Sequence, residues 1–466
     1  MKEFLKFIKS SGIYFVGNVL IKAIAFLMLP IYTKYINPTD YGTYDVAIAY
    51  ITFFCSVLYL DIWSGIMRYM FDFKNDKDKY KPIYTGGSIF LISSAIYMII
   101  LLIIGSFINI KYLLYIGLYG FTMNLQNLCS YIARGLGKNY LYVLSGIIGS
   151  IVTVALNIIL IVYIKMDYRA LYISSIFGFL SSSLIIAIGC KIFRLDFYKF
   201  WDKKLFRSLV LFSLPLCLNS VAYWFLTSYN KVVISHSLTK ADNGLYGVAG
   251  KFAVAINLLT SCFQMAWQEI AFSKGMSKDN KTFYSEAINL YIKFLGIGTL
   301  GLITCIYFIF PFMVDPQYNE AKNIIPLYLV ATIASALSGF IGNIFGAIKK
   351  TKGIFVTMVA ASIVNVTIIK LLIGNIGLNA ANISLLLGFI VNIALRIKML
   401  QKDMTIKIDY KFIAVLLIMF AIIYNAYYHF GMIGNALMII LTILFALYVF
   451  KDYIQIFIKK IKGDVR

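Results

Sequence analysis

Long apolar runs, separated by short polar gaps, extend along the whole chain. A bilayer core of about 30 Å takes roughly 20 apolar residues per helix, and a helix satisfies its own backbone hydrogen bonds in lipid. The pattern predicts about fourteen transmembrane helices, near residues 11–34, 44–67, 83–109, 112–133, 140–164, 168–190, 208–235, 245–272, 288–313, 323–348, 353–373, 378–395, 412–430 and 433–450. Twelve helices, with two spans wrongly divided, is the main alternative.

Composition supports a membrane protein. Of 466 residues, 61% are apolar and 14% are charged, and the mean hydropathy is +0.83. A soluble domain with a polar surface needs far more charge, and the gaps between the runs are too short to hold one. We therefore expect an all-α polytopic membrane protein.

The charges are distributed unevenly between the two sides of the predicted bundle. Most of the 43 Lys and Arg residues fall in the N-terminus, the C-terminal tail and every second loop. The positive-inside rule then places both termini on the cytoplasmic side of the membrane. The net charge of +23 mostly follows from this topology, so we expect no nucleic-acid partner.

The spans group into two sets of six and a final pair. We expect an N-terminal bundle at 1–190, a basic cytoplasmic linker at 191–207, a second bundle at 208–395, and two extra helices with a tail at 396–466. A short internal match relates 37–54 to 239–256. In it, Tyr41-Gly42-Thr43-Tyr44 falls opposite Asn243-Gly244-Leu245-Tyr246. The match suggests two parallel repeats about an axis along the membrane normal.

Charged residues inside spans are costly in lipid, so each one is a functional hypothesis. Lys22 lies in the middle of the first span, one turn from Asn18, while Lys231 and Lys251 lie in the outer parts of the seventh and eighth spans. Asn219 adds a polar amide to the seventh. These five residues predict a substrate site whose deep charge is net positive, which suits an anionic substrate such as a pyrophosphate.

Other lysines have a simpler explanation. Lys293 and Lys370 lie near span ends, where a long side chain reaches the interface. Among acidic residues, Asp61 in the second span and Glu269 in the eighth are candidates for ion coupling.

The spacing of Asp61, Ser64 and Arg68 places the three on one helix face. An internal ion pair of Asp61 with Arg68 is the slightly favoured alternative to a coupling role for Asp61.

No pattern of an enzyme or a metal site was found. HExxH, GxSxG and zinc-ligand spacings are missing from the sequence, and the segment from Gly244 to Lys251 departs from a P-loop in spacing and lacks its Ser or Thr. We expect no enzymatic activity, no cofactor and no metal.

The opening stretch resembles a known family. Its pattern LP-x3-T-x5-P-x2-YG-x-Y is formed by Leu29, Pro30, Thr33, Pro38, Tyr41, Gly42 and Tyr44. This pattern, with FQMAWQEIAFSK at 263–274, is similar to Wzx-type O-antigen flippases. These form the polysaccharide-biosynthesis branch of the multidrug/oligosaccharidyl-lipid/polysaccharide (MOP) exporter superfamily.

The resemblance implies two MATE-like six-helix bundles, alternating access, and flipping of undecaprenyl-pyrophosphate-linked oligosaccharide repeat units, of O-antigen or capsule type, to the outer leaflet. It also implies that Lys22, Lys231 and Lys251 hold the pyrophosphate. The expected location is the bacterial inner membrane, so the lipid bilayer is one partner. The polysaccharide polymerase and the chain-length regulator are further candidate partners.

Three rival functions remain open. Two belong to the same superfamily: a lipid II flippase, and a proton- or sodium-coupled multidrug antiporter, which predicts deep carboxylates. A membrane polymerase or glycosyltransferase predicts a long external loop with catalytic acids, but the predicted external loops are short.

Overall fold

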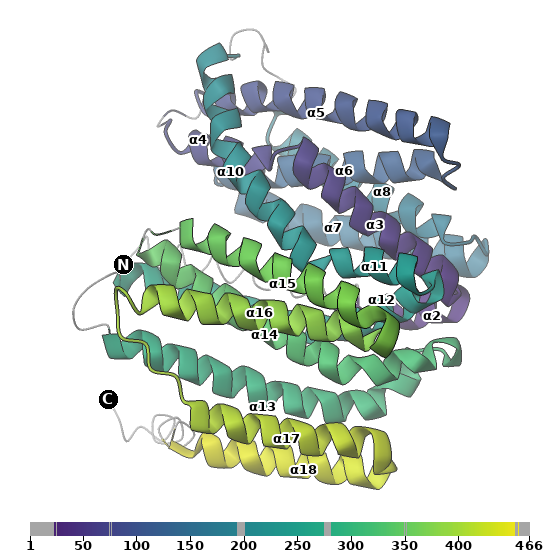
Figure 1. The fold of residues 1–466 in the computed structure, drawn as a ribbon. Coiled ribbons are helices and arrows are strands. Elements are labelled where there is room, and N and C mark those ends of the chain that lie inside the picture. The colour runs from purple at the N-terminus through teal and green to yellow at the C-terminus, as the bar shows by residue number, and fades with distance from the viewer. Residues whose placement is uncertain are drawn as a thin grey trace. The chain divides into compact units, whose positions relative to one another are not determined.

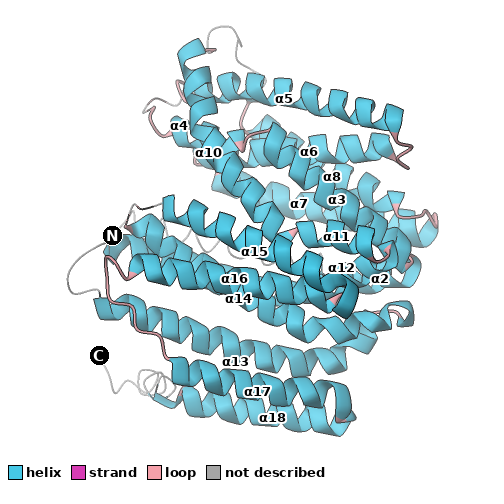
Figure 2. Ribbon diagram, viewed as in Figure 1, coloured by secondary structure: helices cyan, strands magenta, loops and turns pink. Residues whose placement is uncertain are grey.

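The computed structural model describes residues 23–24, 26–73, 75, 77–192, 201–274, 281–348, 350, 352–452 and 455 of the chain. Every regular element in these ranges is a helix (Figure 2). The predicted all-α polytopic fold is therefore confirmed. The predicted Asn18 and Lys22 lie outside the described residues.

Packing divides the chain into two compact units, Met1–Gly247 and Val248–Arg466. The division falls inside one long helix and places the seventh predicted span in the first unit. It does not test the predicted assignment of 208–395 to a second repeat, which remains a prediction.

The first unit consists of helices of very different lengths (Figure 1). They are α2 (Leu29–Tyr35), α3 (Pro38–Leu58), α4 (Ile62–Met70), α5 (Tyr80–Phe107), α6 (Leu113–Gly135), α7 (Asn139–Asn157) with its π-helical extension η1 (Ile158–Tyr163), α8 (Arg169–Gly189), α10 (Lys203–Thr227), α11 (Tyr229–Ser237) and the first residues of α12 (Lys240–Lys274).

The second unit contains the rest of α12 and six further α-helices. They are α13 (Lys281–Met313), α14 (Ile325–Ala347) preceded by the 3-10 helix η4 (Pro316–Ile324), α15 (Lys352–Ile376), α16 (Asn379–Leu400), α17 (Tyr410–His429) and α18 (Gly431–Val449). Within this unit α16 packs against α14 and α15, and the final pair packs against α13 (Figure 1).

Eleven helices in the described ranges are long and apolar enough to cross a membrane. The other three predicted spans also have helical counterparts. The span near 11–34 is described only in part, 112–133 corresponds to α6, and 245–272 corresponds to α12. The described helices thus follow the predicted order of fourteen passes.

Two predicted spans are each divided into two helices. The second span breaks between α3 and α4, where Leu60 and Asp61 adopt positive φ angles of 54° and 52°. Residues other than glycine rarely adopt this conformation, so the break is a local strain point. The seventh span breaks at Ser228, between α10 and α11. The predicted bend at Pro215 lies inside α10, whereas Pro30 lies in the first turn of α2.

The two segments of the suggested repeat meet at glycines. A Cβ on Gly42 would lie 1.7 Å from the carbonyl oxygen of Lys240, and a Cβ on Gly244 would lie 2.1 Å from that of Pro38. The Asn243 amide also donates to the Gly42 carbonyl at 2.9 Å. Under the repeat, Gly42 corresponds to Gly244 and Pro38 to Lys240, so the contact is reciprocal. Reciprocal contact is the geometry of a two-fold related pair, and only glycine permits so close an approach.

Candidate functional site

Helices α10 and α11 run along α3, and three side chains tie them together. The Trp224 indole N–H donates to the Ala49 carbonyl at 2.8 Å. Nearer the end of α11, the Tyr50 hydroxyl and His236 Nε2 share a hydrogen bond of 2.9 Å. Because Trp224 is buried, its hydrogen bond fixes how α10 and α3 are aligned along their lengths.

An ion pair lies on this seam. Lys231 Nζ on α11 donates to Asp45 Oδ1 on α3 at 2.8 Å. The side chains are 26% and 15% exposed, respectively, so the pair is partly shielded from solvent. The second oxygen, Asp45 Oδ2, is buried and accepts no hydrogen bond from the described residues. Among the described residues Lys231 is therefore the cation on which this carboxylate depends, and moving it away would leave Asp45 without an ion-pair partner.

Gly247 on α12 lies beside the Asp45 carboxylate. A Cβ at Gly247 would lie 3.1 Å from Asp45 Oδ2. The missing side chain thus leaves the backbone of α12 close to the unsatisfied oxygen.

A polar groove of about 430 Å³ opens along the same helices. It is lined by Thr52, Ser56, Asn219, Ser220, Tyr223, Trp224, Thr227 and Ser228. The groove therefore offers hydroxyls, one amide and two aromatic side chains. Asn219 Oδ1 is buried, and no described residue donates a hydrogen bond to it.

The groove and the ion pair share their helix faces. On α3, Asp45, Thr52 and Ser56 are spaced by seven and four residues, which places them along one stripe. Lys231 follows Thr227 by four residues across the Ser228 break. At 1.5 Å rise per residue, the pair lies roughly 10 Å along the helix from the groove. We call this combination the Lys231 site.

Two of the predicted substrate residues, Lys231 and Asn219, lie in the Lys231 site. Lys251, by contrast, lies in α12 within the second unit and is partly exposed. The backbone of Glu269 is in α12, but its side chain is outside the described residues. Its coupling role stays a prediction.

The sequence interpretation missed Asp45. The residue lies near the start of a predicted span, where an acidic side chain looks interfacial. Its partner changes the expected electrostatics, because Lys231 and Asp45 together are neutral. The predicted net positive deep charge therefore does not hold for this pair at rest.

Asp61 has a different environment from the one predicted. It precedes α4 at the helix break, and the Ser64 hydroxyl donates to Asp61 Oδ1 at 3.0 Å. Arg68 pairs instead with Asp72 at 2.6 Å. The expected Asp61–Arg68 ion pair is thus wrong, because the acidic residue one turn beyond Arg68 is within reach of its guanidinium group.

The two lysines expected at the interface behave differently. Lys370 is exposed on α15, as a snorkelling residue should be. The Lys293 ammonium lies 5.2 Å from the centre of the Phe412 ring, a distance typical of a cation–π contact.

A second buried cation occurs in the other unit. Arg396 on α16 is 2% exposed. It donates to the Ser338 carbonyl and to the hydroxyls of Ser338 at 3.1 Å and Thr357 at 3.2 Å. No Asp or Glu of the described residues pairs with it. Asn392 joins the same network, accepting from the Ser338 hydroxyl at 2.8 Å and donating to the Thr357 carbonyl at 2.9 Å.

The two arrangements differ in what they can do chemically. Arg396 uses its donors to join α14, α15 and α16. Lys231 is more exposed, and it lies beside a groove suited to hydroxyl-rich ligands. An ammonium can bind a phosphate as a point charge, so the chemistry of Lys231 suits an anionic ligand.

Solved structures with the same fold define the class. A structure titled "Lipid II flippase MurJ, inward closed conformation" superimposes with a TM-score of 0.72 at 16% identity, covering 94% of this chain and 99% of that one. An inward-facing multidrug resistance MATE family transporter of the MOP superfamily gives 0.64 at 14% identity, covering 85% and 95%. The chain is a multi-pass membrane protein with the fold of MOP-superfamily transporters.

The family follows from sequence. The model described as "Polysaccharide biosynthesis protein" matches residues 7–267, more than half of the chain, and the chain belongs to this family. A Haemophilus influenzae protein named for the Lsg locus is 23% identical over 270 residues, which are 56% of this chain and 65% of that protein. The chain thus spans just under two thirds of that curated relative. The predicted polysaccharide branch of the superfamily is confirmed.

Proposed function

We propose that the protein is a flippase for undecaprenyl-pyrophosphate-linked oligosaccharide repeat units, of O-antigen or capsule type. The observation that carries the proposal is the Lys231 site, in which an exchangeable cation lies next to a groove of hydroxyl, amide and aromatic groups. A lipid-linked oligosaccharide presents the matching chemistry, an anionic phosphate group joined to sugars. Membership of a polysaccharide biosynthesis family supports the same substrate class.

In this proposal Lys231 holds the pyrophosphate, and Asn219 with the groove hydroxyls binds the first sugars. Asp45 balances the ammonium when the site is empty. Binding of the substrate moves Lys231 from one anion to another, and the free energy of the new contact has to offset the unpaired Asp45 carboxylate that is left behind. Lys22, Lys251 and Asn18 stay proposed substrate ligands.

We also propose that both termini lie in the cytoplasm of a bacterial inner membrane and that transport runs outward by alternating access. An inside-negative potential of about 100 mV favours outward movement of a double anion by roughly 4 to 5 kcal/mol. Proton counter-transport through Asp61 or Glu269 is the alternative energy source. The polysaccharide polymerase and the chain-length regulator are proposed partners.

Complementation tests the substrate class. The full chain is expressed in bacteria lacking their own repeat-unit flippase, with surface polysaccharide and cytoplasm-facing lipid-linked repeat units as readouts. The proposal predicts restored surface polymer and loss of the accumulated repeat units. The repeat unit of the host is the probe, so strains with several different glycans are used.

Two parallel assays separate the rivals at equal membrane levels of the protein. Rescue of cells depleted of their lipid II flippase, without rescue of surface polymer, would identify a peptidoglycan precursor as the substrate. Resistance to cationic drugs, without effect on either glycan, would favour the antiporter.

A further inference from the structure

A second, larger cavity lies in the first unit, with lining residues that differ from those of the groove at the Lys231 site. Its volume is about 830 Å³, within the range of small-molecule sites. Helices α3, α5, α6 and α8, the end of α11 and the first residue of α12 contribute to its wall. All of them belong to the first unit.

One part of this cavity is apolar. Ile51, Phe54, Leu101, Ile104, Leu113 and Ile116 line it. On the same helix α5, Leu102 and Phe107 are 70% and 84% exposed. A helix that exposes such residues faces lipid chains in a membrane. The apolar part of the cavity is therefore next to a lipid-facing helix.

The other part of the cavity is charged and polar. Asp40, Lys111, His236 and Lys240 line it, together with several hydroxyls. His236 is engaged with Tyr50. Lys240 is exposed, and it forms no ion pair with the residues that the structure describes.

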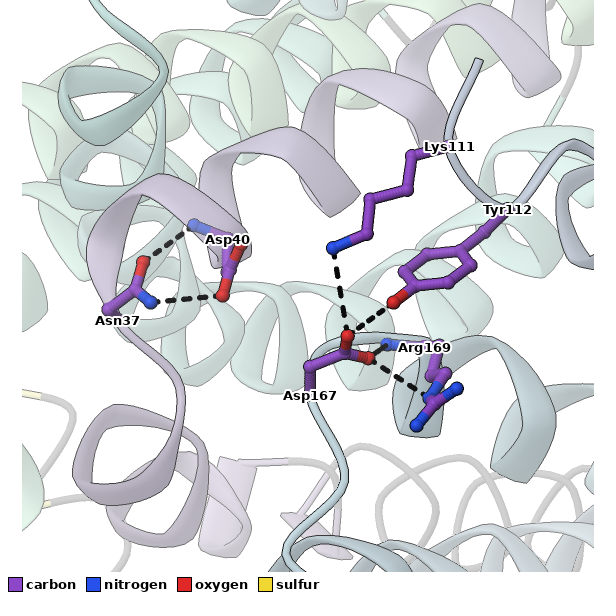
Figure 3. Close-up of polar contacts among 6 residues, drawn as sticks. All are labelled: Asn37, Asp40, Lys111, Tyr112, Asp167 and Arg169. Atoms are coloured by element: carbon purple, nitrogen blue, oxygen red, sulfur yellow. Dashed lines mark hydrogen bonds and ion pairs between the residues drawn. The ribbon is translucent and has the colours of Figure 1, made fainter. Parts of the chain in front are cut away.

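Lys111 belongs to a cluster that Figure 3 shows. Its Nζ lies 3.7 Å from Asp167 Oδ2 and 4.8 Å from the centre of the Tyr112 ring. The Tyr112 hydroxyl donates to the same carboxylate, and Arg169 Nε lies 3.4 Å from Asp167 Oδ1. The hydrogen bond to Tyr112 raises the pKa of the Lys111 ammonium, so Lys111 stays charged at neutral pH. The cluster holds this cation at the rim.

Besides His236, the charged residues that line the cavity are the cations Lys111 and Lys240 and the anion Asp40, which sum to a single positive charge. Asp167 and Arg169, which lie beyond the lining, form an ion pair with each other and add no net charge. The N-terminus of α6, which has no acidic residue in its first turn, also lies at the rim, and its dipole favours an anion. The first turns of α3 and α12 each hold an acidic residue of their own, Asp40 and Asp242.

We propose that this cavity binds an anionic glycerophospholipid of the bilayer, with its phosphodiester between Lys111 and Lys240 and part of one acyl chain against Ile104 and Leu101. A phosphodiester carries one negative charge, which matches the rim. The residues that line this cavity differ from those that line the groove of the Lys231 site, although both sites use α3 and α11.

Lipid retention by the purified full-length protein in detergent tests the proposal. Native mass spectrometry compares phosphatidylglycerol with phosphatidylethanolamine of identical chains, both added at the same concentration. Retention of phosphatidylglycerol over phosphatidylethanolamine is expected. Equal retention of the two lipids would overturn the proposal, because it would show that the rim charge selects nothing.

Competition distinguishes the source of the phosphate. Inorganic phosphate and glycerol phosphate should not displace the lipid at concentrations where phosphatidylglycerol is retained, since they lack the chain. Displacement by either at equal concentration would overturn a lipid site in favour of a free-phosphate site. Stronger retention of undecaprenyl phosphate than of phosphatidylglycerol would overturn the proposed occupant.

Matched variants locate the site. Lys240→Gln should weaken retention roughly tenfold through loss of one charge-assisted contact, whereas Lys165→Gln, an exposed loop lysine outside the cavity, should not. Ile104→Trp should block the chain, whereas Leu102→Trp on the outer face of α5 should leave retention unchanged. The same retention in Lys240→Gln and Ile104→Trp as in wild type would contradict the proposal.

Discussion

Lys231 and Arg396 are both cations inside helical units, yet their surroundings differ in two respects. Arg396 is almost fully buried and bonded to neutral groups of two neighbouring helices, α14 and α15. Lys231 keeps about a quarter of its side-chain surface exposed and has a single carboxylate partner, whose other oxygen is unsatisfied.

The comparison distinguishes a charge that stabilises the fold from a charge that is available to bind a ligand. Removing Arg396 leaves several buried groups without a donor. Removing Lys231 leaves one partly shielded carboxylate without its ion-pair partner. Stability should therefore depend on Arg396, and transport should depend on Lys231.

The largest effect is expected where α3 meets α12, the contact that places Asp45. In Gly42→Ala the new Cβ would lie 1.7 Å from a backbone oxygen, so the helices must separate. We expect loss of most folded protein, measured as monodisperse material recovered in detergent. Gly87→Ala in α5, where a Cβ meets nothing within 4 Å, is the matched control and should be recovered like wild type. Normal recovery of Gly42→Ala would show that the close contact is not required.

Arg396→Leu is expected to come next. It leaves the Thr357 hydroxyl and the Ser338 groups without their buried donor, at a cost of about 3 kcal/mol in unfolding free energy. Thermal unfolding in detergent measures this loss, and Lys398→Leu, an exposed position on the same helix, is the control. Transport per folded molecule should be unchanged. A transport defect without destabilisation would show that Arg396 acts in transport and not in folding.

Lys231→Gln should have the opposite profile. Loss of a charge-assisted contact to phosphate should reduce transport by about tenfold or more. The unfolding free energy should fall by about 1 to 2 kcal/mol, less than in Arg396→Leu, because the pair is only partly buried. The readout is surface polysaccharide in complemented cells at equal protein level. Lys370→Gln, an exposed lysine on α15, is the control. Equal transport by both variants would remove Lys231 from the substrate site.

The smallest effect is expected in the groove. Asn219→Ala removes an amide that contributes one hydrogen bond to a sugar, so transport should fall by roughly fivefold. Leu218→Ala, an exposed neighbour on α10, should show no change. The variants are compared by the rate at which lipid-linked repeat units disappear from the cytoplasmic leaflet. A defect that is the same in both would indicate a general effect on α10.

The fold was largely predictable because apolar runs of membrane length leave few alternatives. The break between α3 and α4 was not, because neither Gly nor Pro marks Leu60 and Asp61. Lys231 was found because a cation within a span is costly wherever it lies. Asp45 was missed because it lies close to a predicted span end, and Arg396 because α16 continues to Leu400, beyond the predicted end at 395. Long-range partners such as Lys231 and Asp45 leave no local pattern in one sequence.

An exchange of the two charges, in the double variant Asp45→Lys and Lys231→Asp, tests the central claim most directly. Flipping of a lipid-linked repeat unit is measured in proteoliposomes, together with thermal stability. If Lys231 binds the substrate, the double variant regains the stability of an ion pair but not transport, because the cation now lies on α3 beside Gly247. Recovery of both stability and transport would contradict the account and show that the pair only holds α3 and α11 together.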